Sequence, residues 1–259
     1  MVVTTQQFQL MNVQQIQRTS SAFAAILADG FVVAWGHPEY AGDCSAVQGQ
    51  LRNVEQIQAT AGASAAILAD QSVVAWGNPE ECGDCSAVHD QLRNVQHIQA
   101  SHQAFAAILA DGSVVAWGNP EYGGDCSAVQ DQLSNVLEIQ ATQEAFATIL
   151  ADGSVVAWGN PYNGGDCSAV QNQLSNVLEI QATQGAFAAI LADGSVVAWG
   201  NPYNGGDCFA VQHQLRNVQQ IQATAGAFAA VLADGSVFAW GNPQCGGDCS
   251  AGQDELQYL

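Results

Sequence analysis

The chain has 259 residues, and its formal net charge of −20 comes from 24 Asp and Glu residues against four Lys and Arg. Because a phosphate backbone has to be met by Lys and Arg, this charge excludes a nucleic-acid-binding protein. Apolar residues make up 48% of the chain. They are spread too evenly for a disordered protein, and no apolar run reaches the roughly 20 residues of a membrane helix.

A unit of 41 residues repeats six times along the chain. Its tryptophan recurs at Trp35, Trp76, Trp117, Trp158, Trp199 and Trp240, and one cysteine recurs at Cys44, Cys85, Cys126, Cys167, Cys208 and Cys249. Leu10, Leu51 and Leu256 share one phase of the unit, so residues 1–13 and 247–259 cover the same part of it. We therefore expect a single domain over residues 1–259, built of six repeats with overlapping terminal segments.

Each unit contains three predicted strands. The first is exemplified by residues 54–59, which follow a turn at Asn53, since Asn tolerates left-handed φ. The apolar runs AFAAIL and VVAW come next, joined by Asp-Gly, the strongest short signal of a hairpin. These turns are Asp29-Gly30, Asp111-Gly112, Asp152-Gly153, Asp193-Gly194 and Asp234-Gly235. In the second unit Asp70-Gln71 takes this place, so a side chain has to accept strained or altered turn geometry.

The segment that closes each unit, such as SAVQDQL, has two interpretations. A short outer segment up to Leu51, extended like a strand, agrees with the turn at Asn53. A short helix is the alternative, because Val47, Leu51 and Val54 have helical spacing and Ser45 with Gln48 could form a capping box.

Three strands per unit, repeated without linkers, indicate an array in which each sheet packs on its neighbours. The sequence therefore predicts an all-β fold, a β-propeller of six short three-stranded blades that form a closed or nearly closed ring.

The pattern V-x-x-I-x-A, then x-L-x-D-G-x-V-x-x-W-G and a Gly-containing loop, resembles the repeat of the regulator of chromosome condensation family. The repeat length is closest to that of the bacterial β-lactamase-inhibitor propellers of the same superfamily. The resemblance implies a β-propeller, usually with seven blades. This chain departs from it in having six units and in replacing the usual His before the apolar run. That position is held by Phe23, Ser64, Phe105, Phe146, Phe187 and Phe228.

The tryptophans have a predicted structural role, wedged between adjacent blades. One branch of the family senses UV-B light through tryptophans that are held against arginines. In this chain Gly follows every Trp and only four arginines exist.

Two loops of the unit vary from copy to copy, and we expect them to emerge on one face. The turn between the first two strands varies at Ser20-Ser21, Ala61-Gly62, His102-Gln103, Gln143-Glu144, Gln184-Gly185 and Ala225-Gly226. The loop after Trp-Gly supplies the predicted partner-binding residues Glu39, Tyr40, Glu80, Glu81, Glu121, Tyr122, Tyr162, Asn163, Tyr203 and Asn204. Tyrosine on a rigid scaffold is a favoured interface anchor.

Residues with metal-binding or redox chemistry do not form a recognisable site. The aspartates before the hairpin turns and before the cysteines are explained by capping of their own backbone. Cys82 with Cys85 and Cys245 with Cys249 could form two local disulfides in an oxidising compartment. His37, His89, His97, His102 and His213 occupy unrelated phases. We expect no catalytic residues, no metal and no cofactor.

The predicted function is a non-catalytic scaffold or accessory subunit that binds a protein with a basic patch, in an association that weakens with salt. Neither nucleic acid nor membrane insertion is expected, although attachment to a membrane complex stays open. The alternatives are an inhibitor of a hydrolase and a signalling propeller of the exchange-factor or UV-B-sensor type. No secretory signal is visible. The near-identical copies resemble arrays of dinoflagellate algae, so the cytoplasm and an organelle interior, including the plastid, are both considered.

Overall fold

The computed structural model describes residues 9–250, which form six antiparallel sheets of three strands each, here called blades 1 to 6. In each blade the strands lie in chain order, so successive strands are hydrogen-bonded neighbours. Blades 1 to 3 contain β1 (Val13–Arg18), β2 (Ala22–Leu27), β3 (Val32–Gly36), β4 (Val54–Ala59), β5 (Ala63–Leu68), β6 (Val73–Gly77), β7 (Val95–Ala100), β8 (Ala104–Leu109) and β9 (Val114–Gly118). Blades 4 to 6 contain β10 (Val136–Ala141), β11 (Ala145–Leu150), β12 (Val155–Gly159), β13 (Val177–Ala182), β14 (Ala186–Leu191), β15 (Val196–Gly200), β16 (Val218–Ala223), β17 (Ala227–Leu232) and β18 (Val237–Gly241). The three predicted strands per unit are confirmed.

The hairpin turns between the second and third strands have the predicted geometry. Their glycines, Gly30, Gly112, Gly153, Gly194 and Gly235, have φ between 77° and 84°. At Gly112 a Cβ atom would also lie 2.8 Å from Cα of Asn135 at the start of the next blade. Asp111 Oδ1 accepts the Ser113 N–H and hydroxyl, and the hydroxyl is the main reason why the pKa of Asp111 is lowered.

Gln71 holds the same left-handed position with φ of 65°, as the second unit's departure from Asp-Gly predicted. A left-handed conformation costs an L-residue about 1–2 kcal/mol, and glycine avoids this strain. We expect Gln71→Gly to raise the free energy of unfolding by about 1 kcal/mol, measured as a higher urea midpoint. Gln71→Ala, which keeps the Cβ atom, should stay close to the starting protein, and an equal gain from both variants would contradict this explanation.

The outer segments are neither strands nor α-helices. Four of them contain 3₁₀ turns, η3 (Ser86–Val88), η5 (Ser127–Gln132), η7 (Gln171–Gln173) and η9 (Phe209–Val211), and residues 45–50 of the first unit form other turns. The capping box considered for Ser45 and Gln48 is not formed, because the Gln48 side chain donates to the Val32 carbonyl and accepts from the Cys44 thiol. The turn at Asn53 is confirmed by its φ of 53°.

Hydrophobic cores lie between blades rather than within them. Five buried clusters each combine residues of two successive blades. In the cluster between blades 4 and 5, Ile149 and Val155 of the first blade meet Ile180, Phe187 and Trp199 of the second. Because both faces of an inner blade are apolar, each blade depends on its neighbours for burial.

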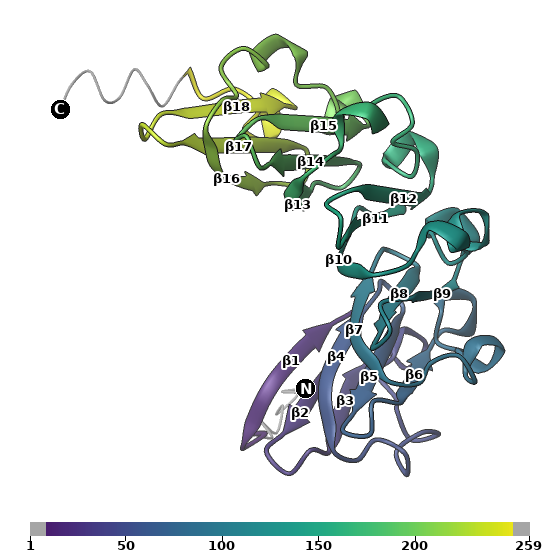
Figure 1. Ribbon diagram of the computed structural model, residues 1–259. Coiled ribbons are helices and arrows are strands. Elements are labelled where there is room, and N and C mark those ends of the chain that lie inside the picture. The colour runs from purple at the N-terminus through teal and green to yellow at the C-terminus, as the bar shows by residue number, and fades with distance from the viewer. Residues whose placement is uncertain (1–8, 251–259) are drawn as a thin grey trace, which may run out of the picture.

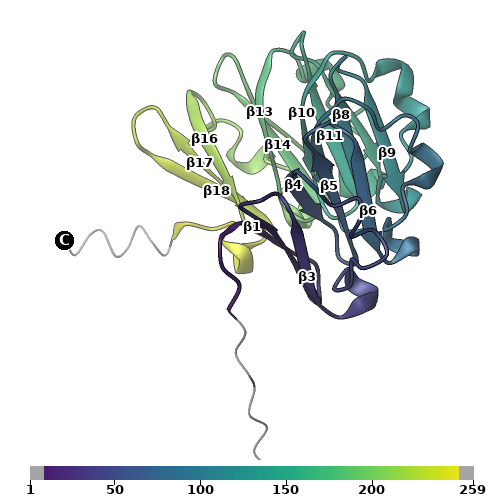
Figure 2. The ribbon, with the colours of Figure 1, turned by 90° about the horizontal axis from the view of Figure 1, so that it is seen from below.

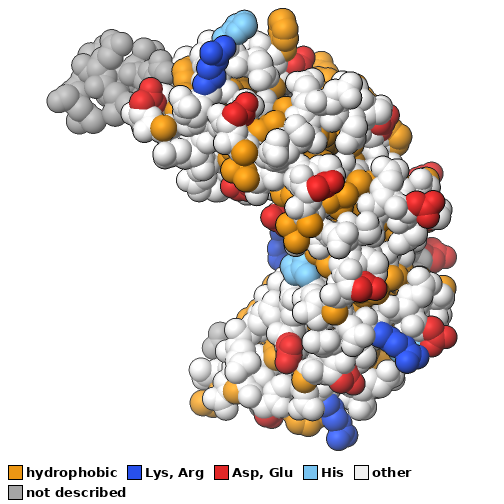
Figure 3. All heavy atoms as spheres, viewed as in Figure 1, with side chains coloured by type: hydrophobic (Ala, Val, Ile, Leu, Met, Phe, Trp, Pro, Cys, Tyr) orange, Lys and Arg blue, Asp and Glu red, His pale blue; other side chains and the backbone are white. Residues whose placement is uncertain are grey.

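The six blades form an open crescent, with blade 1 and blade 6 at its two ends (Figures 1 and 3). Figure 2 shows the blades from below, where they fan out one after another from β1 and β3 to β16–β18. The predicted ring is therefore not closed by residues 9–250. The angle between neighbouring blades is fixed by their packing, and the five steps from blade 1 to blade 6 do not bring blade 6 back against blade 1.

One chain of backbone hydrogen bonds links the blades along the concave side. Ser20 N–H donates to the Ala61 carbonyl, Ala61 to His102, His102 to Gln143, Gln143 to Gln184 and Gln184 to Ala225, at 2.8–3.0 Å. These residues are the first positions of the variable turns between the first and second strands. The same turns that vary in side chain therefore hold the crescent together through their backbone.

The helical segments of residues 9–250 do not include one with the length and apolar character that crossing a membrane requires.

Candidate partner-binding face

Both variable loops of each blade lie on one face of the crescent, and a hydroxyl group at the end of the first strand ties them together. Thr142 Oγ1 accepts the Ala145 N–H at 3.0 Å and donates to the Asn163 carbonyl at 3.0 Å. The hydroxyl recurs at Thr19, Thr60, Ser101, Thr142, Thr183 and Thr224. The sequence analysis assigned these residues no role, although an unvarying Thr or Ser at this phase was the available signal.

A short 3₁₀ turn after each Trp-Gly presents the predicted partner-binding residues. These turns are η1 (Pro38–Tyr40), η2 (Pro79–Glu81), η4 (Pro120–Tyr122), η6 (Pro161–Asn163), η8 (Pro202–Asn204) and η10 (Pro243–Cys245). In η6, proline begins the turn, the Asn160 side chain accepts the Tyr162 N–H, and Gly164 ends it with φ of 99°. Cap, proline and left-handed residue fix the backbone, so each side chain between them has a set direction.

Some of the predicted partner-binding residues are exposed, and others are half-buried. Tyr162 and Tyr203 are 62% and 79% exposed. Glu39, Glu80 and Glu121 are also exposed, whereas Tyr40, Glu81, Tyr122, Asn163 and Asn204 are half-buried. Glu81 lies against Gly62, and one of its carboxylate oxygens is buried without a partner.

Contacts between the two loops make the face rigid. Glu144 accepts from the amides of Asn160 and Asn163, both at 2.7 Å. In the preceding blade the Asn119 amide donates to Gln103 at 2.9 Å. The face therefore offers phenol rings, carboxylates and amides from backbone that is already ordered, which is the chemistry of recognition.

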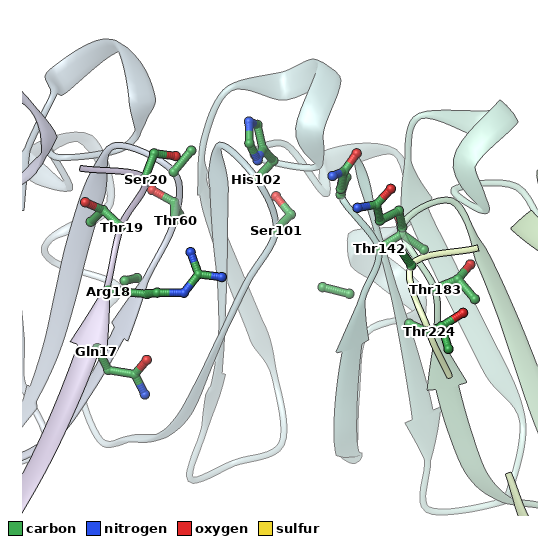
Figure 4. Close-up of a pocket in the computed structure, with 17 residues that line it drawn as sticks. Gln17, Arg18, Thr19, Ser20, Thr60, Ser101, His102, Thr142, Thr183 and Thr224 are labelled. Atoms are coloured by element: carbon green, nitrogen blue, oxygen red, sulfur yellow. The ribbon is translucent and has the colours of Figure 1, made fainter. Parts of the chain in front are cut away.

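A polar hollow of about 640 Å³ opens along the concave side, lined by the first-strand ends and the adjoining turns of all six blades (Figure 4). Figure 4 shows the hydroxyl residues in a row with Arg18 and His102 among them. Arg18 is distinctive because the other five blades have alanine at its phase. The sequence analysis missed Arg18, and this break in the repeat could have found it.

The tryptophans pack between blades in five of the six units. Trp158 is 4% exposed, stacks on Phe146 at 5.3 Å between ring centroids, and donates its indole N–H to the Gly123 carbonyl of the preceding blade at 2.9 Å. Trp76, Trp199 and Trp240 make the same inter-blade hydrogen bond. Trp117 is equally buried, but its indole nitrogen has no partner. Trp35, in blade 1, is 37% exposed.

The two disulfides considered for Cys82 with Cys85 and for Cys245 with Cys249 are not formed, since all four residues carry free thiols. Cys82 ends η2 in the left-handed conformation, and its thiol donates to Thr60 in the buried interior rather than facing Cys85. Burial raises the pKa of Cys82 to about 12, so this thiol stays protonated at neutral pH. Across residues 9–250, His, Cys, Asp and Glu side chains do not gather in groups of three that could hold a metal ion.

Comparisons with known proteins identify the fold. The chain matches no protein-family model, and the search of curated proteins gave no relative. Among solved structures, Prp20p of Saccharomyces cerevisiae matches with a TM-score of 0.54 and 15% identity over 88% of this chain and 72% of Prp20p. The same protein, described as yeast RCC1 in its complex with Kap60, matches with a TM-score of 0.55 and 16% identity over 90% of this chain and 70% of that chain. The fold is that of the RCC1-type propellers.

Human WBSCR16 supports this conclusion with a TM-score of 0.54 and 16% identity, covering 90% of this chain and 78% of WBSCR16. The resemblance that the repeat pattern predicted is thus confirmed at the level of fold. Identities of 15–16% do not carry a partner or an activity from these RCC1-type propellers to this chain.

Proposed function

We propose that this chain is a non-catalytic protein-binding propeller, a scaffold or accessory subunit whose partner docks on the face formed by the variable loops. The observation that carries the proposal is the high exposure of Tyr162 and Tyr203 on loops whose backbone is fixed. Large aromatic side chains on an ordered backbone lose little entropy on binding, which makes them strong interface anchors.

The RCC1-type fold agrees with this proposal. The solved structure of Prp20p is described together with its binding to Gsp1p and histones, and the second Prp20 structure is a complex with Kap60. These are properties of Prp20, and they support protein binding as the class of function for this chain.

The charge of the chain defines the kind of partner. With a net charge of −20 and exposed carboxylates at Glu39, Glu80 and Glu121 on the same face, the partner should carry a basic patch. Between exposed charges, salt screens attraction, so the affinity should fall as ionic strength rises.

The test begins with isolation of the partner by affinity purification and continues with titration calorimetry on the purified pair. Replacing both Tyr162 and Tyr203 by alanine is expected to weaken binding by at least about tenfold, because each truncation removes an aromatic anchor. The matched control replaces Leu137 and Leu178 by alanine. These leucines are similarly exposed, but they lie near the start of β10 and β13, whereas the variable turns follow the ends of these strands. Unchanged affinity in the tyrosine variant, or an equal loss in the leucine variant, would contradict docking on this face.

A further inference from the structure

Blade 1, at one end of the crescent, exposes an apolar face. The corresponding face of each of blades 2 to 6 is buried against the preceding blade. Ile16 is 53% exposed, whereas Ile57, Ile98, Ile139, Ile180 and Ile221 at the same phase are at most 1% exposed. Phe23 and Trp35 are exposed as well, although their counterparts Phe146 and Trp158 are buried. Blade 1 therefore presents the receiving half of a blade–blade interface with nothing from residues 9–250 on it.

Blade 6 exposes the complementary half at the other end. Val237 is 42% exposed, whereas Val32, Val73, Val114, Val155 and Val196 are at most 2% exposed. Ala229 and Val231 in β17 are half-buried, whereas their counterparts Ala188 and Ile190 are buried in the core between blades 5 and 6. Blade 6 thus exposes the face that, in each of blades 1 to 5, packs against the next blade.

Polar groups at the two ends are complementary too. The exposed Trp35 indole lies at the phase of the indoles that donate to the preceding blade, and Gly246 lies at the phase of their acceptors Gly123, Gly164 and Gly205. The backbone chain along the concave side begins at Ser20 and ends at Ala225, within the described residues. The carbonyl of Ser20 and the N–H of Ala225 are the two groups that would extend it.

The shapes of the two ends also agree. A Cβ atom at Gly123 would lie 2.6 Å from the Phe146 ring, so Gly at the end of the 3₁₀ turn leaves room for a Phe in the next blade. Blade 1 carries Phe23 and blade 6 carries Gly246 with φ of 97°. The same pairing of Gly in one blade with Phe in the next occurs at the interfaces between blades 3 and 4, 4 and 5, and 5 and 6.

We propose that a second copy of this chain docks head to tail, with the outer face of its blade 6 on the free face of blade 1. The argument is continuity with an interface that the chain already makes five times with the same residue types. Such an interface is heterologous, because the two surfaces differ. A dimer formed in this way still has one free blade 1 face and one free blade 6 face. Since the copies repel one another with a net charge of −20 each, this association strengthens with salt, opposite to the partner binding described above.

The test uses two variants of the full chain and analytical ultracentrifugation over a range of concentrations. Ile16→Glu places a charge on the blade 1 face, and Val237→Glu places one on the blade 6 face. Both positions are exposed in the single chain, so far-UV circular dichroism should be unchanged. Each variant alone should associate at least about 100-fold more weakly than the starting protein, because a charge would be buried without a partner.

Mixing the two variants is the decisive measurement. Val237→Glu keeps an intact blade 1 face and Ile16→Glu keeps an intact blade 6 face, so the mixture should form a 1:1 dimer that does not grow further. A starting protein that stays monomeric at every concentration and at high salt would overturn the proposal. So would association of either variant alone at full strength, since that indicates pairing of two identical faces.

Discussion

Replacing Trp158 by alanine is expected to lower the free energy of unfolding by about 3–5 kcal/mol, the usual range for removing a buried large aromatic side chain. The indole is 4% exposed, stacks on Phe146, and donates to the backbone of the preceding blade. Removing it leaves a cavity in the core between blades 3 and 4 and an unpaired buried carbonyl at Gly123. Urea unfolding followed by far-UV circular dichroism measures the loss.

The chain supplies its own control for this prediction. Trp35 has the same sequence neighbours and stacks on Phe23, but it is 37% exposed, and residues 9–250 place no other blade against it. We expect Trp35→Ala to cost about 1 kcal/mol or less when measured on dilute protein. Equal losses from the two variants would show that the tryptophans stabilise their own blade rather than the contact between blades.

Replacing Ser64 by phenylalanine should destabilise the protein by about 1–3 kcal/mol, although phenylalanine is the residue of the other five units. The reason lies in the preceding blade, where Ala41 stands at the position of Gly123. A Cβ atom at that position collides with the phenylalanine ring, as the geometry at Gly123 and Phe146 shows. Ser64 is buried, so the added ring has no route to solvent.

Adding Ala41→Gly should reverse the loss. Ala41 has φ of 68°, so glycine also relieves left-handed strain there. The double variant is expected to exceed the sum of the single changes by at least about 1 kcal/mol in a double-mutant cycle. Additive effects would mean that Ala41 and Ser64 do not compensate each other.

The interface between blades 2 and 3 shows the same conflict without the compensation. Cys82 stands at the position of Ala41 and Gly123, while Phe105 is retained in the next blade. Here the indole of Trp117 has lost its hydrogen-bond partner. Among the five interfaces, this one combines a Cβ atom at the end of the 3₁₀ turn with a Phe in the next blade.

Local features of the fold could be predicted because they depend on a few neighbouring residues. Gly112 and Asn53 fix left-handed turns, Asp111 caps its own backbone, and each signal recurs in five or six of the units. The outer segments were less predictable, because the Gln48 side chain could bond either to the nearby backbone at Ser45 or to a distant strand. In the folded chain it donates to the Val32 carbonyl instead of forming the local cap.

The candidate site was predictable in its position and less so in its members. Variation after each Trp-Gly located the loops, and the hydroxyl of Thr142 explains why they meet the variable turns. Two features depend on contacts between segments far apart in the sequence. Glu81 packs against Gly62, and Arg18 lines the polar hollow.

By itself, the sequence determined the blade: its three strands, its turns and the apolar character of both its faces follow from residue types within 41 positions. Only the tertiary structure decided that the six blades of residues 9–250 form an open crescent whose two end faces these residues leave uncovered. The physical reason is that closure depends on the angle between neighbouring blades, summed over five interfaces. That angle is set by side-chain packing between blades, such as Gly123 against Phe146, and no local pattern of residues specifies it.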